Sequence, residues 1–264
     1  MEPVRSFCKD SLAVRIYADR TAMGAAAARD GAALLRRLLA QQDTVRAVFA
    51  AAPSQNEFLE ALCAAPDIDW KRVTAFHMDE YVGLDAAAPQ GFGNFLRARV
   101  FDRLPFGQVC YLNGNAPDVE AECSRYAGLL AQAPIDIVFM GIGENGHIAF
   151  NDPPVAEFDD PAAVKVVALD EVCRNQQVHD GCFADIGQVP THALTLTVPT
   201  LAGAKHHPVS YTHLPLWRPV PAVPRGSCAA SVPVMRQAWW AAAWWCRDGH
   251  EPRSRPGSVR AWRP

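Results

Sequence analysis

The sequence lacks the long apolar runs that membrane segments need. No stretch of 18 consecutive apolar residues occurs in its 264 residues, which argues against a membrane-spanning helix. The first residues also lack the apolar core of a secretory leader, because Lys9 and Asp10 interrupt them. We therefore expect a cytoplasmic protein with no membrane partner.

Paired cysteines and a dinucleotide fingerprint are missing as well. The eight cysteines stand singly, without the CxxC pairs typical of a zinc site or a dithiol redox centre. Free, mostly buried thiols and no metal site are therefore expected. The glycine-rich turn at 141–146 does not have the GxGxxG spacing with an acidic residue about 20 positions later, which argues against a nicotinamide cofactor.

What is present is the composition of a globular chain with an unusual end. Half of the residues are hydrophobic and a fifth are charged, which argues against a disordered protein. The net charge of −3 is the sum of two unlike parts. Residues 1–205 hold 17 Lys and Arg against 26 Asp and Glu, whereas residues 206–264 hold 8 against 2.

Residues 206–264 also contain six of the 7 Trp and nine of the 21 Pro, with no Lys, Ile, Phe or Asn. An Arg-rich arm with interleaved aromatics could bind nucleic acid or an anionic surface. The proline spacing supports neither a helix face nor a strand ladder, which favours a segment that is out of frame or disordered. We predict a domain at 1–205, an atypical tail at 206–264 and no nucleic-acid partner.

The first part alternates between helical and strand patterns. This alternation predicts βαβ units, and hence an α/β fold with a Rossmann-like, mostly parallel sheet flanked by helices and an incomplete or irregular C-terminal part. Ligands bind such sheets beyond the carboxyl ends of the strands. The pattern predicts helices at 21–42, 54–65, 93–104 and 120–133, and strands at 45–52, 72–84, 135–147 and 192–198.

Three segments that follow predicted strands carry polar residues. The first holds Ser54 and Gln55, at the start of a helix whose free backbone N–H groups would suit a phosphate. An ordinary helix cap explains the same residues. The second holds Asp79 and Glu80, which should point to opposite faces of a strand, so that one carboxyl at most enters a given pocket. Burial would make such a carboxyl a proton shuttle, although solvated loop acids remain the alternative.

The third segment is GIGENGHIAFNDP, from Gly141 to Pro153. Gly143 and Gly146 let the backbone turn tightly where a ligand approaches, and His147 can exchange a proton near neutral pH. Asp152 could orient that imidazole, as carboxylates do in catalytic triads. A lone histidine is more often structural, but its place in a glycine-rich strand exit favours a functional role.

Together FHMDEYVGL, LNGNAPD and GIGENGHIAFNDP resemble the glucosamine-6-phosphate deaminase (isomerase) family, over roughly residues 10–205. The resemblance implies conversion of glucosamine 6-phosphate and water to fructose 6-phosphate and ammonia, with no metal or organic cofactor. It implies that Asp79 moves the proton between C2 and C1, and that His147 opens the sugar ring. Asn145 and Asp152 fall at the two positions that assist this histidine.

The chain also departs from this family. Members often have Asp where this chain has Asn145 and Glu where it has Asp152, and an Asn can hydrogen-bond but cannot take a proton. Arg174 is the one candidate for the phosphate-binding arginine, because Gln177 stands at the aligned place. The further strand and basic loop of the family are not recognisable after residue 205.

Two other functions remain open at this point. The fold that the resemblance implies is shared with 6-phosphogluconolactonases, although HIAFNDP favours the deaminases. It is also used by sugar-phosphate-binding regulators, which place a helix-turn-helix module ahead of it. Only about 20 residues precede the first predicted helix here, too few for such a module. We predict a small sugar phosphate as partner, and apolar strands are compatible with a homo-oligomer.

Overall fold

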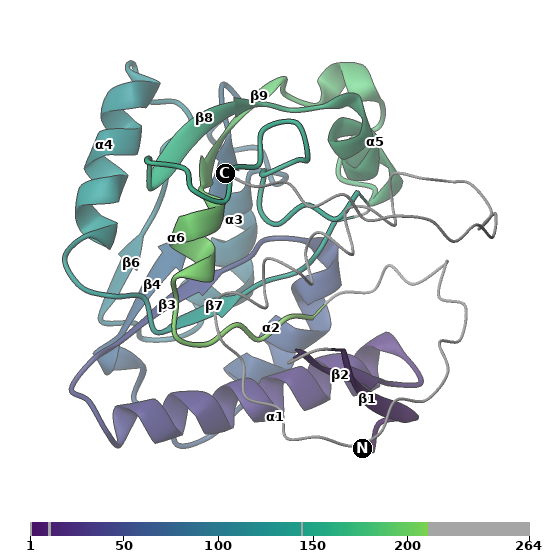
Figure 1. Ribbon diagram of the computed structural model, residues 1–264, viewed down its shortest axis with the longest axis vertical. Coiled ribbons are helices and arrows are strands. Elements are labelled where there is room, and N and C mark those ends of the chain that lie inside the picture. Colours follow the sequence, from purple (N-terminus) through teal and green to yellow (C-terminus); the bar gives the residue numbers. More distant parts are fainter. Residues whose placement is uncertain (1, 10–11, 144, 211–264) are drawn as a thin grey trace, which may run out of the picture.

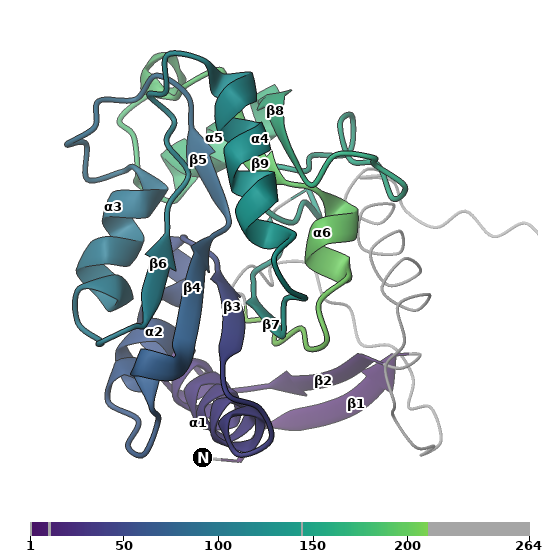
Figure 2. The ribbon, with the colours of Figure 1, turned by 90° about the vertical axis from the view of Figure 1, so that its left-hand side faces the viewer.

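The structure is a computed structural model that describes residues 2–9, 12–143 and 145–210. Its centre is a four-stranded parallel sheet in the order β6-β4-β3-β7 (Figures 1 and 2). Every residue of β3 is buried, as expected for a parallel strand that is covered on both faces. The strands are β3 (Val45–Phe49), β4 (Val73–His77), β6 (Gln108–Cys110) and β7 (Ile137–Phe139).

One face of this sheet packs against the first three α-helices. Ala47 and Phe49 of β3 share a hydrophobic core with Leu35 of α1, Phe58 of α2 and Leu96 of α3. A side-chain cap starts α1, where the carboxylate of Asp19 accepts from the Ala22 backbone N–H at 2.7 Å. The helices are α1 (Arg20–Leu39), α2 (Asn56–Cys63), preceded by the 3₁₀ turn η1 (Pro53–Gln55), and α3 (Phe92–Leu96), which continues as a π-helical turn (Arg97–Phe101).

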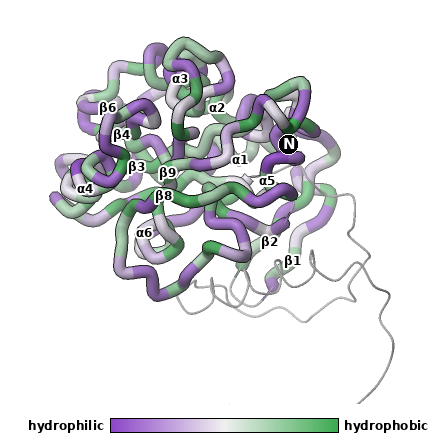
Figure 3. Tube along the Cα trace, turned by 90° about the horizontal axis from the view of Figure 1, so that it is seen from above, coloured by the Kyte–Doolittle hydropathy of each residue, from purple (hydrophilic) through white to green (hydrophobic). Residues whose placement is uncertain are grey.

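The other face packs against α4, α6 and a second, antiparallel sheet. Val48 of β3 shares a core with Tyr126 of α4, Leu201 of α6 and Leu194 of β9. Figure 3 shows that the tube is mostly hydrophobic where β3, β9 and β8 lie at the centre. The second sheet has the order β5-β9-β8 and consists of β5 (Asp79–Tyr81), β9 (His192–Leu196) and β8 (Val164–Ala168), and the helices are α4 (Val119–Leu130) and α6 (Val198–Ala202).

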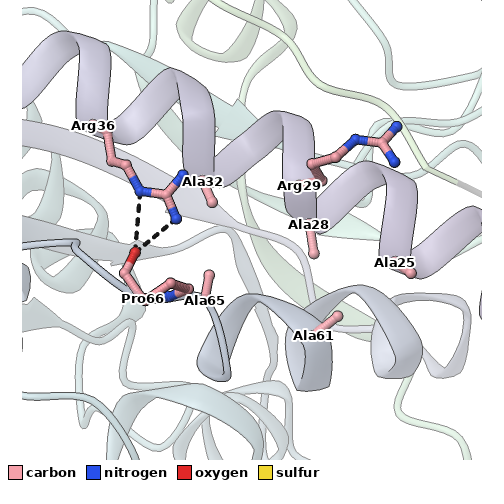
Figure 4. Close-up of a pocket in the computed structure, with 8 residues that line it drawn as sticks. All are labelled: Ala25, Ala28, Arg29, Ala32, Arg36, Ala61, Ala65 and Pro66. Atoms are coloured by element: carbon pink, nitrogen blue, oxygen red, sulfur yellow. Dashed lines mark hydrogen bonds between the residues drawn. The ribbon is translucent and has the colours of Figure 1, made fainter.

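The remaining elements lie outside these layers. An antiparallel hairpin precedes α1, and α5 follows β8. Between α1 and α2 is a hollow of about 250 Å³ lined largely by alanines, where the Arg36 guanidinium donates to the Pro66 carbonyl (Figure 4). The elements are β1 (Arg5–Lys9), β2 (Leu12–Ile16), α5 (Glu171–His179), η2 (Trp70–Arg72) and η4 (Ile186–Gln188).

The structure confirms the predicted α/β class with its parallel sheet and flanking helices, but not every predicted element. The predicted strand at 72–84 is two strands in different sheets, because the backbone leaves the parallel sheet at Met78, whose carbonyl accepts from Leu196 N. The predicted strand at 135–147 is regular only as β7, because the glycines that follow turn the chain. The antiparallel pairing of 192–196 with β5 and β8 was not foreseen.

The sheet continues a few residues beyond the predicted domain boundary. Residues 206–210 run parallel to β7, where Val138 N donates to His206 O at 2.9 Å and Ser210 N donates to Met140 O at 3.0 Å. These contacts are two isolated bridges and not a regular strand, at the place where the sequence shows no recognisable further strand. The predicted tail from 211 to 264 lies outside the described residues.

Within the described ranges, the structure has no helix long and apolar enough to cross a membrane. Cys63, Cys110, Cys123, Cys173 and Cys182 are free thiols. The expectation of free thiols is wrong for Cys8, which is disulfide-bonded.

Candidate active site

The loop that leaves β7 brings Asn145, His147 and Asp152 together. The Nδ1 atom of His147 lies 2.7 Å from Oδ1 of Asn145 and 3.0 Å from Oδ1 of Asp152. The Asn145 amide donates to the same Asp152 oxygen at 2.9 Å. The three side chains that the sequence singles out in this loop therefore form one hydrogen-bonded cluster.

This arrangement selects one tautomer of His147. Both neighbours of its Nδ1 atom are acceptor oxygens, because the Asn145 amide nitrogen is already directed at Asp152. The proton of a neutral imidazole therefore belongs on Nδ1, and Nε2 keeps its lone pair. The side chain is 10% exposed, so a ligand that entered here would meet a base whose orientation is fixed.

Asp152 is a buried carboxylate that is stabilised by donors. Burial by itself would raise its pKa, but the hydrogen bonds and charge of His147 and the Asn145 amide outweigh this, and its pKa lies below the ordinary value. The residue is 1% exposed, and its second oxygen has no hydrogen-bond partner among the described residues. At neutral pH Asp152 is thus an anion that can stabilise a protonated His147.

The glycines of the loop make room for the histidine ring. A Cβ atom at Gly143 would lie 2.2 Å from Cε1 and 2.3 Å from Nε2 of His147. These distances are too short for any side chain at this position unless the ring moves. Gly143 N donates to His147 O at 2.9 Å, and Gly146 has a φ of +85°. Both predicted glycines therefore shape the loop, and Gly143 lies against the imidazole itself.

Strand β9 connects this loop to Asp79. The hydroxyl of Thr195 accepts from Phe150 N at 3.1 Å, and the Asn151 amide donates to Leu196 O at 2.8 Å. Thr195 is also the residue opposite Asp79 in the antiparallel register of β5 and β9. Thr195 was not identified from the sequence, because nothing in a short alternating strand marks one threonine among others.

Asp79 is held in surroundings unlike those of Asp152. It is 5% exposed, and burial, together with the charge of Glu80, raises its pKa well above the ordinary value. Burial is the largest cause of the raised pKa of the Cys173 thiol, and the negative charges of Asp152 and Asp79 raise that pKa further. Asp79 and Asp152 therefore both lie within electrostatic reach of Cys173.

Glu80, the neighbour of Asp79, is directed elsewhere, as strand alternation predicts. Its carboxylate accepts from three backbone N–H groups, those of Tyr81 at 2.9 Å, Phe92 at 3.1 Å and Gly93 at 2.8 Å. The latter two belong to the first turn of α3, whose free N–H groups favour an acceptor. The two carboxyls thus have separate surroundings.

Ser54 and Gln55 lie where the carboxyl end of β3 meets the glycine-rich loop. A Cβ at Gly141 would lie 3.3 Å from the Gln55 amide nitrogen and 3.9 Å from the Ser54 hydroxyl. Gln55 donates to the Ser210 carbonyl at 2.7 Å and accepts from the Ser210 hydroxyl at 3.1 Å. The Gln55 amide therefore fastens residues 206–210 to the end of the sheet, and a phosphate role for either residue stays a prediction.

Arg174 has a structural hydrogen-bond pattern. One terminal nitrogen of its guanidinium donates to Ile186 O at 2.6 Å and to Val189 O at 2.8 Å, which ties α5 to the segment that follows it. Its Nε atom is buried without a partner among the described residues. Gln177 is buried on the same helix. The structure does not place Arg174 with the histidine cluster, and its phosphate role stays a prediction.

Cys173 was missed by sequence analysis because α5 itself was not predicted. Ligand atoms of His147, Asp152 and Cys173 lie within 4.8 Å of one another, the one such group of metal-ligating side chains among the described residues. The histidine and the carboxylate already satisfy each other by a hydrogen bond, and burial favours the protonated form of the thiol by raising its pKa. These features suit a proton-transfer cluster better than a metal centre, because Cys173 would have to lose its proton to bind a metal ion.

Comparison with known proteins places this geometry in context. A family model described as glucosamine-6-phosphate isomerases/6-phosphogluconolactonase matches residues 18–212. The curated glucosamine-6-phosphate deaminase of an Exiguobacterium species is 39% identical over 138 residues, which are 52% of this chain and 52% of that protein. That of Bacillus thuringiensis is 41% identical over 138 residues, 52% of this chain and 51% of that protein. The chain spans about half the length of the curated relatives that it matches.

Two solved structures have a similar fold. One is a monomeric glucosamine-6-phosphate deaminase, with a TM-score of 0.64 and 28% identity over 72% of this chain and 77% of that chain. The other is the 6-phosphogluconolactonase of Thermotoga maritima, with a TM-score of 0.55 and 19% identity over 70% of this chain and 78% of that chain. The second likeness concerns the fold alone.

Proposed function

We propose that this chain, which belongs to the glucosamine-6-phosphate isomerase/6-phosphogluconolactonase family, is a cytoplasmic enzyme that isomerises and deaminates glucosamine 6-phosphate. Water enters the reaction, and fructose 6-phosphate and ammonia leave. A metal ion or an organic cofactor is not needed for these steps. The single observation that carries the proposal is the pairing of an oriented imidazole, His147, with a separate buried carboxyl, Asp79.

The steps of this reaction suit these groups. The free Nε2 of His147 takes the proton of the O1 hydroxyl and returns it to the ring oxygen O5 as the C1–O5 bond breaks, and Asp152 stabilises the imidazolium between the two transfers. Asp79, once ionised, then removes the proton from C2 of the open amino aldehyde and delivers it to C1. Water replaces nitrogen at C2, which yields the ketose and releases ammonia. A carboxyl whose pKa is raised by burial holds an abstracted proton more readily than an ordinary aspartate, which suits this transfer.

A lactonase is the second candidate, because the matching family model includes 6-phosphogluconolactonases and a solved one shares the fold. Its chemistry needs a base to activate water, which His147 could supply, but it gives no role to a second proton-transferring carboxyl. A sugar-phosphate sensor is the third, and it would bind its ligand without turnover. Curated relatives named as deaminases at 39% and 41% identity support the first candidate.

The test is ammonia release from glucosamine 6-phosphate by the purified chain. We expect turnover that falls by about 10²-fold or more in His147→Ala, because a positioned acid–base group contributes about 10²–10⁴. His192→Ala, which removes an exposed histidine outside the cluster, is the matched control and should retain activity.

Three outcomes separate the candidates. Ammonia release that depends on His147 supports the deaminase. Hydrolysis of 6-phosphogluconolactone without ammonia release identifies a lactonase. Saturable binding of glucosamine 6-phosphate with neither reaction, in a chain that is folded by circular dichroism, identifies a sensor and rejects both enzymes.

A further inference from the structure

Glu80 is a buried acidic residue that the proposed reaction does not use. Its side chain is 13% exposed, yet both oxygens are occupied: one accepts from Tyr81 N and Phe92 N, and the other accepts from Gly93 N. These backbone N–H groups fix the carboxylate in place and favour its charged form, but burial outweighs them and raises the pKa of Glu80 above its ordinary value. Glu80 is therefore an internal anchor, and its negative charge acts on the neighbouring Asp79.

The backbone around Glu80 is closely packed. A Cβ at Gly93 would lie 3.1 Å from Oε2 of Glu80, and one at Gly114 would lie 3.2 Å from its Cγ and 1.8 Å from the Tyr81 carbonyl oxygen. Strand β5 is at the edge of its sheet, so β9 holds it from one side only. The bonds of Glu80 to the start of α3 supply the second attachment of the strand that carries Asp79.

Among the titratable groups near Asp79, Glu80 is the one whose charge raises the pKa of Asp79. His77 of β4 lies 3.7 Å from Glu80 but is neutral, because burial lowers its pKa to about 3. Burial raises the pKa of Tyr81 on β5 itself and of Cys173 on α5, so both remain protonated at neutral pH. Asp152 and Asp170 are further carboxylates near Cys173, and both also raise the pKa of its thiol.

We propose that Glu80 is a positioning residue for Asp79, whose strand it fastens to the first turn of α3 while holding a negative charge beside the Asp79 carboxyl. The idea rests on the proposed function only in assigning a use to Asp79. Burial raises the pKa of both adjacent carboxyls, but the three N–H donors oppose this at Glu80, whereas the pKa of Asp79 is raised well above its ordinary value, so Glu80 ionises first. Asp79 therefore keeps its proton to a higher pH than burial alone would cause.

The experiment is a ¹³C NMR titration of the Asp79 carboxyl in the free protein, with its signal identified by loss in Asp79→Asn. Glu80→Gln removes the charge and keeps the shape, and we expect the Asp79 midpoint to fall by about one pH unit. Glu80→Asp keeps the charge but shortens the anchor, so the midpoint should stay raised while kcat for ammonia release falls about tenfold or more. Glu60→Gln, at an exposed ion pair with Arg103, is the control and should change neither.

An Asp79 midpoint that is equal in the folded wild-type and Glu80→Gln proteins would overturn the charge effect. If Glu80→Gln does not fold, unchanged kcat and KM in Glu80→Asp would overturn the positioning role. Because the titration needs no substrate, it separates a failure of this proposal from a failure of the proposed function: a chain without turnover in which Glu80→Gln still lowers the Asp79 midpoint retains the first and loses the second.

Discussion

The two carboxyls of the candidate site, Asp152 and Asp79, are both buried but differ in what surrounds them. Asp152 receives hydrogen bonds from an amide and an imidazole, and its pKa is lowered in spite of its burial. The Asp79 carboxyl accepts no hydrogen bond from another described residue, and burial, together with the charge of Glu80, raises its pKa. Burial raises the pKa at Asp79, with the charge of Glu80 adding to it, whereas at Asp152 the donors outweigh burial.

This difference divides the chemical work between the two groups. An acid that stays ionised can orient and stabilise a histidine, whereas one whose pKa is raised can carry a proton to and from carbon. Under the proposed function, the same residue type thus serves two roles in one site. Variants that remove one carboxyl at a time test this division.

The largest effect is expected from Asp79→Asn, which keeps the shape of the side chain but cannot exchange a proton. Ammonia release should fall by about 10²-fold or more, because carbon-bound proton transfer has no substitute base. Asp43→Asn, at an exposed aspartate, should retain the wild-type rate. Comparable rates for Asp79→Asn and wild type would remove Asp79 from the mechanism.

A smaller effect is expected from Gly143→Ala, which acts on the His147 ring and hence on its contact with Asp152. The added Cβ would overlap the His147 ring, so the ring must move away from Asp152. We expect at least a tenfold loss of turnover and a destabilisation of about 1–3 kcal/mol. Gly128→Ala in α4, where a Cβ meets nothing within 4 Å, should instead stabilise the fold by about 0.4–1 kcal/mol and preserve turnover. Equal activities would show that the ring position is not critical.

Sequence alone predicted the parts of the site that follow the parallel strands. Ser54, Asp79 and His147 each follow a buried apolar run, and parallel strands bring their carboxyl ends to one edge. The side chains that complete the site come from elements with weaker patterns. Cys173 lies on a polar helix, and Thr195 lies on a strand whose partner β5 is distant in the sequence.

The directions in which side chains point could not be predicted from the sequence either. Arg174 is a cation in a suitable region, but its guanidinium donates to backbone carbonyls of the following segment. Residues 206–210 looked foreign by composition, yet backbone hydrogen bonds alone are enough to pair them with β7. Ladder hydrogen bonds do not depend on residue type, so composition is a poor guide there.

Thermal unfolding of Asp79→Asn and Asp152→Asn at pH 7 and pH 3 tests the central difference most directly. A carboxyl whose pKa is raised by folding contributes less and less to the stability of the fold as the pH rises above its unfolded pKa of about 4. A carboxyl whose pKa is lowered by folding loses its stabilising contribution as the pH falls through its folded pKa. At pH 7 Asp79→Asn should therefore raise the midpoint by roughly 2–4 °C, and Asp152→Asn should lower it by at least as much. Both differences should shrink at pH 3, where Asp79 is neutral in either state and Asp152 approaches neutrality. Shifts of the same sign at pH 7 would contradict the account.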